Sequence, residues 1–203
     1  SGAPSLFIEG KRLFVALGFL NSNVAAAIRV AINPTLNNNS GDVDKLPWTL
    51  RDSSIDADHS IATQLVDIGK QSWDASETSW DFTRFPLLSS SHRTDSMEIT
   101  FDHLRADWQC MTNEMQMLEE ENNRFFIEAY GLQDELSPEV PIEEITLTCN
   151  PAYRYGIKGT EEEREARLKA DTMAEFLSYA VGCMFGRYSL DEPGLILANQ
   201  GET

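Results

Sequence analysis

The sequence predicts a mainly α-helical fold with a small α+β portion, in which a long coiled-coil-like helix packs with other helices. Apolar residues recur at alternating intervals of four and three through the middle of the chain, which is typical of a heptad seam. N-cap residues precede several further amphipathic stretches. Of the 203 residues, 41% are hydrophobic and 24% are charged, as in globular proteins that bury a core.

Residues 1–50 predict a compact α+β segment. Short strands are expected at residues 6–8 and 43–48. Residues 24–31 carry apolar side chains at helical spacing, and they follow three residues of good N-cap type at positions 21–23. The segment should therefore hold one short helix between its strands.

Residues 51–95 predict a helix followed by an irregular connector. The connector carries the repeated tripeptide Ser-Trp-Asp, with its tryptophans at Trp73 and Trp80. One interpretation is that both rings anchor the connector to the core. The other is a base-stacking platform, which would need cations nearby. Only Arg84 is close in sequence, so the anchoring interpretation is favoured.

Residues 96–203 are expected to form a helical spacer and a C-terminal helical segment. The seam that predicts the spacer consists of Met97, Phe101, Leu104, Trp108, Met111, Met115, Leu118, Asn122, Phe125, Ala129 and Leu132. Asn122 takes a position where a lone polar residue fixes register, and Gly131 suits the residue that follows a helix. Such a helix needs a partner, from residues 55–72, from residues 166–185 or from another subunit.

The last predicted helix opens with a capping box formed by Thr160 and Glu163. Its apolar stripe is expected at Ala170, Met173, Leu177, Ala180 and Met184. A second row holds only small residues, at Ala174, Ser178, Gly182 and Gly186, which favours close packing of another helix. A closing strand is expected at residues 195–197.

The charge balance restricts how this chain could contact DNA. Lysine and arginine number 16 against 33 acidic residues, which gives a formal net charge of -17. Because cations provide most of the affinity for the phosphate backbone, this surface on average repels a duplex. Any DNA contact must therefore come from a local basic patch or from another domain.

The cysteines and the hydropathy indicate the cellular compartment. Cys110, Cys149 and Cys183 are far apart and form no zinc-ligand spacing, so no metal site is expected. Scattered reduced thiols predict a cytoplasmic protein. No apolar run reaches the roughly 20 residues that span a bilayer, so no membrane partner is expected.

No residues with a catalytic pattern are found. Asn150-Pro151-Ala152-Tyr153 looks like the loop with which adenine methyltransferases hold a flipped base, but its third position is Ala152. No G-x-G-x-x-G turn is present to hold a nucleoside cofactor. The chain is therefore expected to contain neither catalytic nor cofactor-binding residues, and the Asn-Pro segment is expected to be a structural turn.

One loop is a candidate nucleic-acid contact. It combines aromatic and cationic side chains that could lie against sugar, base and phosphate, with a further arginine after the last helix. These candidate residues are Tyr153, Arg154, Tyr155, Lys158 and Arg187. Lys11, Arg12 and Arg29 could join them. The alternative is an ordinary connecting loop whose tyrosines pack under the last helix.

Several stretches resemble a known family. Residues 19–22, 33–37 and 41–47 are similar to the end of a target-recognition domain of restriction–modification systems. The later stretches resemble the PglX-type adenine-specific DNA methyltransferases of BREX phage-exclusion systems, namely residues 118–124, 130–132, 145–151, 153–156 and 178–189. The resemblance implies a parent enzyme that transfers a methyl group from S-adenosylmethionine to adenine N6. It also implies that the catalytic domain lies upstream.

Two functions follow as hypotheses. The first is a non-catalytic C-terminal part of such an enzyme, which serves target recognition and domain docking. Its partners would be DNA through the parent enzyme, the upstream methyltransferase domain and other phage-defence proteins. The second is a helical protein–protein interaction scaffold without direct DNA contact, which the acidity favours for this piece. A free-standing helical interaction protein unrelated to methylation is a third possibility.

Overall fold

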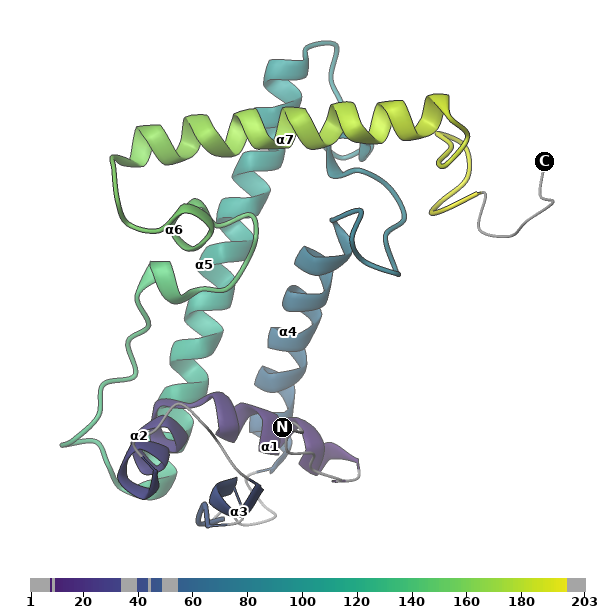
Figure 1. The fold of residues 1–203 in the computed structure, drawn as a ribbon. Coiled ribbons are helices and arrows are strands. Elements are labelled where there is room, and N and C mark those ends of the chain that lie inside the picture. The colour runs from purple at the N-terminus through teal and green to yellow at the C-terminus, as the bar shows by residue number, and fades with distance from the viewer. Residues whose placement is uncertain (1–7, 9, 34–39, 44, 49–54, 197–203) are drawn as a thin grey trace. The chain divides into compact units, whose positions relative to one another are not determined.

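The computed structural model describes residues 8, 10–33, 40–43, 45–48 and 55–196. The described part is mostly helical, as predicted (Figure 1). Its helices are α1 Lys11–Asn21, α2 Asn23–Ile32, α3 Ser40–Val43, α4 Ile55–Asp74, α5 Met97–Tyr130, α6 Pro151–Tyr155 and α7 Glu161–Met184, with short 3₁₀ turns η2 Pro86–Leu88 and η3 Ile142–Glu144.

The small β portion is not found among the described residues. The predicted strand at residues 43–48 is instead the end of α3 followed by a turn. At the C-terminal end, Leu195 makes only an isolated antiparallel bridge to Tyr188. Residues 6 and 7 of the first predicted strand lie outside the described residues. The segment is short, carries two adjacent charged residues and contains Pro47, which cannot donate a hydrogen bond to a strand ladder; these features explain the wrong prediction at 43–48.

The chain divides into two compact units that are discontinuous in sequence. Unit 1 combines residues 1–67 with residues 115–140, and unit 2 combines residues 68–114 with residues 141–203. The predicted ranges 1–50, 51–95 and 96–203 followed sequence order, whereas each compact unit joins two distant segments. Those ranges stay a prediction about domain identity.

Unit 1 turns the chain sharply between α1 and α2 at a single residue. Ser22 is buried, and its hydroxyl accepts a hydrogen bond from the backbone N–H of Ala25 at 3.3 Å and donates one to the carbonyl of Phe19 at 2.7 Å. It therefore caps the start of α2 and the end of α1, as its place among the predicted N-cap residues suggested. No single described helix is long and apolar enough to cross a bilayer, although α1 and α2, bent by 66°, meet that criterion as a pair.

The core of unit 1 forms where α1 and α2 meet the C-terminal half of α5 (Figure 1). Its buried members are Val15, Phe19, Val24, Ala25, Phe126 and Ile127. Phe19 stacks on Tyr130 with ring centroids 5.4 Å apart. Asn123 fixes the neighbouring backbone, because its Oδ1 accepts from the N–H of Asn23 at 2.9 Å and its Nδ2 donates to the carbonyl of Pro138 at 3.2 Å.

The long helix is confirmed, and it ends at the predicted glycine. Gly131 has a φ of 68°, and the N–H of Leu132 donates to the carbonyl of Ile127 at 2.9 Å. The N–H of Gly131 donates to the carbonyl of Glu128 at 3.2 Å. These two bonds form a Schellman motif, which satisfies carbonyls that the helix end would leave free.

The buried edge of α5 departs from the heptad seam near its C-terminus. Seam residues Phe101, Leu104, Met115, Leu118 and Asn122 are buried, but Ala129 is exposed, and Phe126 and Ile127 are buried instead. An α-helix with 3.6 residues per turn rotates a strict 3.5-residue repeat away from its partner by roughly 20° per heptad. In the described part of the chain, α5 is not paired along its length with a second long helix.

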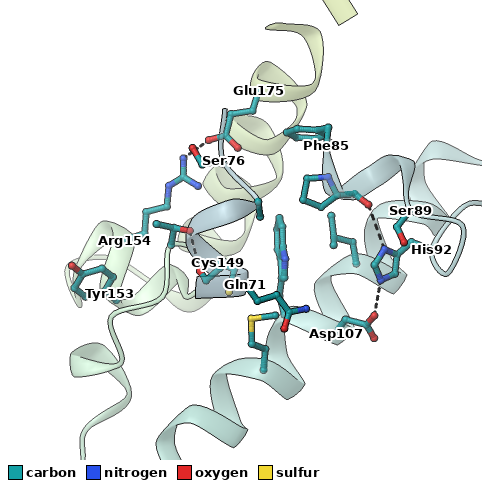
Figure 2. Close-up of a pocket in the computed structure, with 17 residues that line it drawn as sticks. Gln71, Ser76, Phe85, Ser89, His92, Asp107, Cys149, Tyr153, Arg154 and Glu175 are labelled. Atoms are coloured by element: carbon teal, nitrogen blue, oxygen red, sulfur yellow. Dashed lines mark hydrogen bonds and ion pairs between the residues drawn. The ribbon is translucent and has the colours of Figure 1, made fainter. Parts of the chain in front are cut away.

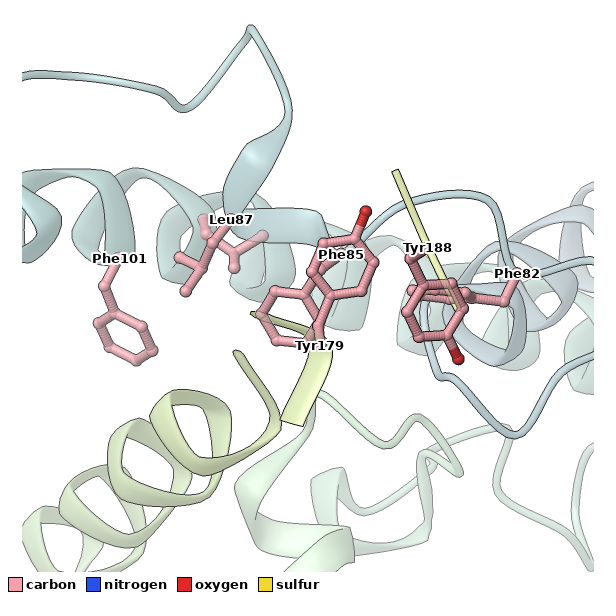
Figure 3. Close-up of a cluster of buried hydrophobic side chains, with 7 residues drawn as sticks. Phe82, Phe85, Leu87, Phe101, Tyr179 and Tyr188 are labelled. Carbon is pink, nitrogen blue, oxygen red and sulfur yellow. The ribbon is translucent and has the colours of Figure 1, made fainter. Parts of the chain in front are cut away.

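Unit 2 has an aromatic core in which α7 covers the connector and the N-terminal half of α5 (Figure 3). Its buried residues are Phe82, Phe85, Leu87, Phe101, Leu104, Tyr179 and Tyr188. The rings of Tyr179 and Tyr188 stack with centroids 5.0 Å apart. Arg105 of α5 makes two hydrogen bonds to the carboxylate of Glu165 on α7, at 2.7 and 2.5 Å, which is the geometry of a bidentate ion pair.

Helix α7 starts as predicted but presents a different face to the core. The capping box is present, with Thr160 Oγ1 accepting from the N–H of Glu163 and the Glu163 carboxylate accepting from the N–H of Thr160. The buried face carries Leu168, Thr172 and Tyr179. The predicted stripe holds only in part, since Met173 packs against the core of unit 2 while other members are exposed. Its members Leu177 and Met184 are 63% and 83% exposed.

The small-residue row does not pack against another helix among the described residues. Ala174 and Ser178 are exposed. Gly186 ends the helix, with a φ of 75° and the N–H of Arg187 donating to the carbonyl of Gly182 at 2.8 Å. Only Gly182 is in close contact, because a Cβ there would lie 2.6 Å from Cδ2 of Tyr188.

The two connector tryptophans are not core anchors. Trp73 is 57% exposed and Trp80 is fully exposed. The prediction fails because Phe82 and Phe85, which come directly after them, fill the core of unit 2 instead. Aromatic content alone does not tell which of several neighbouring rings becomes buried.

Candidate functional site

Unit 2 contains a cleft of about 720 Å³ (Figure 2). Its apolar wall is formed by Phe85, Pro86, Leu104, Trp108 and Met111. Three of these, Leu104, Trp108 and Met111, were predicted as seam residues for a partner helix. In the structure they line this cleft. The size and mixed lining of the cleft are typical of a small-molecule or side-chain binding site.

The polar groups on one side of the cleft belong to a histidine–carboxylate pair. Nε2 of His92 lies 2.5 Å from Oδ2 of Asp107, and Nδ1 of His92 lies 3.4 Å from the carbonyl oxygen of Pro86 (Figure 2). The imidazole is mostly covered by protein while the carboxylate is largely exposed. Both ring nitrogens thus have partners, and the pair holds the connector against α5.

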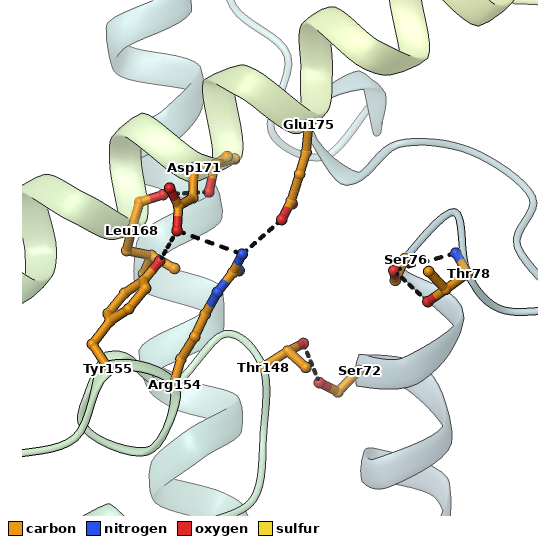
Figure 4. A network of polar contacts seen from close by, with 10 residues as sticks. Ser72, Ser76, Thr78, Thr148, Arg154, Tyr155, Leu168, Asp171 and Glu175 are labelled. Carbon is orange, nitrogen blue, oxygen red and sulfur yellow. Dashed lines mark hydrogen bonds and ion pairs between the residues drawn. The ribbon is translucent and has the colours of Figure 1, made fainter.

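On the other side, the predicted loop reaches the cleft through Arg154. Its Nη2 donates to the carboxylate of Glu175 at 2.7 Å and lies 3.7 Å from the carboxylate of Asp171 (Figure 4). Burial lowers the pKa of Arg154, but the hydrogen bond and the charge of Glu175 outweigh it and raise the pKa above its usual value. The guanidinium is therefore permanently charged and is already neutralised by two carboxylates.

Tyr155 belongs to the same network. Its hydroxyl donates to Asp171 at 2.8 Å, and the guanidinium of Arg167 lies 4.5 Å from its ring centroid. Burial is the main cause that raises the pKa of Tyr155, and the hydrogen bond to Asp171 adds to it. The loop is thus fixed to α7 by charges that compensate one another.

Hydroxyl and thiol groups also line the cleft. Cys149 lines it, but burial raises the pKa of this thiol, so the nucleophilic thiolate is disfavoured at neutral pH. Ser72 and Thr148 share a hydrogen bond of 3.4 Å between their hydroxyls. Within the described residues, no three His, Cys, Asp or Glu side chains are grouped as metal ligands would be.

The other predicted loop residues are placed differently. Tyr153 lines the cleft and is 45% exposed. Lys158 is exposed. Arg187 lies over the ring of its neighbour Tyr188, 5.3 Å from the centroid. Lys11, Arg12 and Arg29 belong to unit 1, so no shared site with the loop is described. A role of these residues in nucleic-acid binding stays a prediction.

Asn150 has a structural task. It caps α6, where its Oδ1 accepts from the N–H of Ala152 at 3.1 Å. Its Nδ2 donates to the carbonyls of Ile142 at 2.7 Å and Ile145 at 2.9 Å. This buried amide uses both ends inside the protein, which fits the interpretation of the Asn-Pro segment as a structural turn.

Sequence reasoning missed the cleft itself. It combines side chains from the end of α4, the connector, α5, the segment before α6, α6 itself and α7, which lie up to about a hundred residues apart. The one local indication was that Trp108 and Met111 are large seam residues flanked by polar ones. Only the packing of the connector decided that they border a cavity.

Two curated proteins are similar to the chain, whereas no protein-family model matches it. The adenine-specific methyltransferase PglX of Lacticaseibacillus casei (strain Zhang) is 34% identical over 200 residues, which cover 97% of this chain and 15% of PglX. The adenine-specific methyltransferase BrxX of Escherichia coli O9:H4 (strain HS) is 30% identical over 203 residues, which cover 98% of this chain and 16% of BrxX.

The chain is similar to one segment of the PglX-type adenine-specific methyltransferases. The predicted resemblance is thereby confirmed. The chain spans about a sixth of the length of these curated relatives. In the described residues no glycine lines the cleft and no strand-to-helix turn borders it. That the S-adenosylmethionine of the parent enzyme is bound outside this chain stays a prediction.

Proposed function

We propose that this chain is a non-catalytic part of a site-specific N6-adenine DNA methyltransferase of a phage-exclusion system, and that it serves target recognition and domain docking. The similarity of nearly the whole chain to a short segment of PglX and BrxX carries this proposal. In it, S-adenosylmethionine and the methyl transfer belong to other parts of the parent polypeptide. The parent's partners are DNA and its own catalytic domain.

The polar groups of the cleft support a non-catalytic role. His92 is paired with Asp107, and Arg154 is paired with Glu175. A general base or a nucleophile needs a group that is available to a substrate. Both ring nitrogens of His92 have partners within the protein, Asp107 and the carbonyl of Pro86, so neither is available to a substrate.

A docking role is supported by an apolar stripe on the outer face of α7. Leu177, Val181, Met184 and the following Phe185 are all substantially exposed. They recur at intervals of four, three and one residues, so they share one side of the helix. Contiguous apolar side chains on a charged protein are typical of an interaction surface. This observation also favours the second candidate function, a scaffold that binds protein and no DNA.

A segment replacement tests the proposed function. In PglX of L. casei, the matching segment would be deleted or replaced by this chain, and N6-methyladenine would be measured in target DNA. We expect the deletion to abolish site-specific methylation while S-adenosylmethionine binding is retained, and the replacement to restore methylation at least in part. A matched replacement carrying Leu177→Asp and Val181→Asp should fail to restore it, because both changes alter only exposed positions of the docking face.

Two results would contradict the proposal. One is binding of S-adenosylmethionine by the 203-residue chain itself, measured by calorimetry. The other is unchanged methylation after the deletion. If the replacement restores methylation but the chain shows no DNA binding, the second candidate, a scaffold that binds protein and no DNA, is the correct function.

A further inference from the structure

We propose that a second groove of unit 2, lined by Arg84 and Arg93, binds phosphate groups of the DNA backbone. This inference rests on the proposed function and adds a contact that the sequence patterns did not indicate. The groove has a volume of about 390 Å³. Its described lining residues are Arg84, Leu87, Leu88, Arg93, Thr94, Asp95, Met97, Thr100 and Leu190.

The two arginines supply the positive charge. Arg84 is exposed, and its Nη2 donates to the carbonyl of Leu190 at 2.9 Å, which leaves its other N–H groups available. Arg93 is exposed, and its guanidinium makes no ion pair within the described part of the chain. Two guanidiniums at one groove are suited to phosphate, because each presents a planar fork of donors to its oxygens.

The walls of the groove are ordered by the fold. Leu87 is a buried member of the core of unit 2 (Figure 3). The N–H of Thr94 donates to Oγ1 of Thr100 at 3.1 Å, and the hydroxyl of Thr94 donates to the carbonyl of Ser96 at 2.8 Å. The segment that carries Arg93 is therefore held before any ligand arrives, which lowers the entropic cost of binding.

The groove is a better phosphate site than the predicted loop that carries Arg154. Arg154 faces two carboxylates, so its charge is compensated inside the protein. The groove, by contrast, is lined by two arginines and one carboxylate, Asp95. In a chain with a net charge of -17, such a locally positive surface is where a phosphate backbone can approach.

Duplex binding across a salt series tests the inference. Fluorescence anisotropy would measure binding of a labelled duplex of about 30 base pairs by the 203-residue chain and by its Arg84→Ala/Arg93→Ala variant. We expect the variant to bind about ten-fold or more weakly at low salt, with a slope of log K against log salt that falls by about 0.9 for each lost phosphate contact. The matched control, Lys70→Ala/Lys169→Ala, removes the same charge at two lysines that carboxylates of unit 2 already pair, and should change binding far less.

Two more variants separate binding from folding. Arg93→Glu alters an exposed, unpaired side chain, so it should weaken binding while the helical circular dichroism stays unchanged. Asp95→Asn removes the lining carboxylate and should tighten binding. Inorganic phosphate at matched ionic strength distinguishes the source of the phosphate. Duplex binding that resists about 5 mM phosphate assigns the polymer backbone, and saturation by inorganic phosphate alone assigns a free anion.

The inference is overturned if the chain does not bind the duplex, even where inorganic phosphate alone binds, or if both double variants weaken binding equally. This failure is distinct from failure of the proposed function. A chain that restores methylation with an inert groove would refute the groove alone. A chain that binds DNA through the groove but never restores methylation would refute the proposed function alone.

Discussion

Two glycines determine how closely the chain can fold back on α7. Gly186 adopts a left-handed conformation that ends the helix. One turn earlier, Gly182 lies against the ring of Tyr188, which this reversal brings back. The sequence presented both as members of one small-residue row. A row of small residues indicates close approach, but it does not tell whether a helix, a single ring or the chain's own reversal comes close.

We expect Gly182→Ala to destabilise unit 2 by about 1–3 kcal/mol, because the added methyl group would overlap Tyr188 in a packed core. Urea unfolding followed by circular dichroism would measure the change. Gly69→Ala is the matched control, since Gly69 is helical and a Cβ there meets nothing within 4 Å. It should stabilise the protein by up to about 1 kcal/mol. Equal effects at the two sites would contradict the packing argument.

At the scale of elements, local chemistry predicted where helices start and end better than it predicted which of their faces are buried. The capping box at Thr160 and the terminating Gly131 depend on a few neighbouring residues, and both were predicted correctly. The buried face of α7 depends on which aromatic residues of the connector arrive there. Trp80 and Phe82 are two residues apart, yet Phe82 is buried in the core of unit 2 and Trp80 is fully exposed.

Asn122 shows why a polar residue sits on the buried edge of α5. Its Nδ2 donates to the carbonyl of Gly18 at 3.1 Å, while its Oδ1 has no partner within the described residues. Gly18 lies in the last turn of α1, whose carbonyls lack partners within the helix. The amide thus donates to a free carbonyl at the end of another helix. The heptad pattern had instead predicted that Asn122 fixes the register of helix pairing.

We expect Asn122→Leu to destabilise unit 1 by about 1–3 kcal/mol, because it leaves the buried carbonyl of Gly18 without a donor. Asn113→Leu on the same helix is the control, since Asn113 is exposed and should change stability by less than about 0.5 kcal/mol. Chemical denaturation of both variants gives the comparison. A more stable Asn122→Leu protein would mean that burying the amide costs more than its hydrogen bond contributes.

At the scale of the whole molecule, alkaline pH should weaken the fold. Burial is the main cause that raises the pKa of Tyr155, Tyr179 and Tyr188, and each has a hydrogen-bond partner that adds to it. A raised folded pKa means that the folded state keeps the proton after the unfolded chain has lost it. The stabilisation is therefore complete below the ordinary tyrosine pKa of about 10 and is lost as the pH rises above it.

The midpoint of urea unfolding should thus fall steadily between about pH 9.5 and pH 11. Tyr155→Phe should make this fall shallower, because one of the three contributing hydroxyls is removed. Absorbance at 295 nm would follow tyrosine ionisation in the same samples. A midpoint independent of pH over this range would contradict the prediction.

The mainly helical class and the long helix followed from periodicity, whereas the cleft and the groove did not. Gln71 and Glu175 border one cavity, and Arg84 and Leu190 share a hydrogen bond, although about a hundred residues separate each pair. Periodicity describes one element at a time. Sites that join distant segments depend on tertiary packing, which a single sequence does not display.

Helix α5 begins in unit 2 and ends in unit 1, and so the first piece of unit 2, residues 68–114, interrupts unit 1 as an insertion. An exchange of either unit for a homologous module would need crossovers at three junctions, one inside α4, one inside α5 and one after residue 140. Recombination at a single breakpoint would separate the two segments that together form the core of one unit. Segments of this kind should therefore be inherited as one block, and truncated variants should respect the same three junctions.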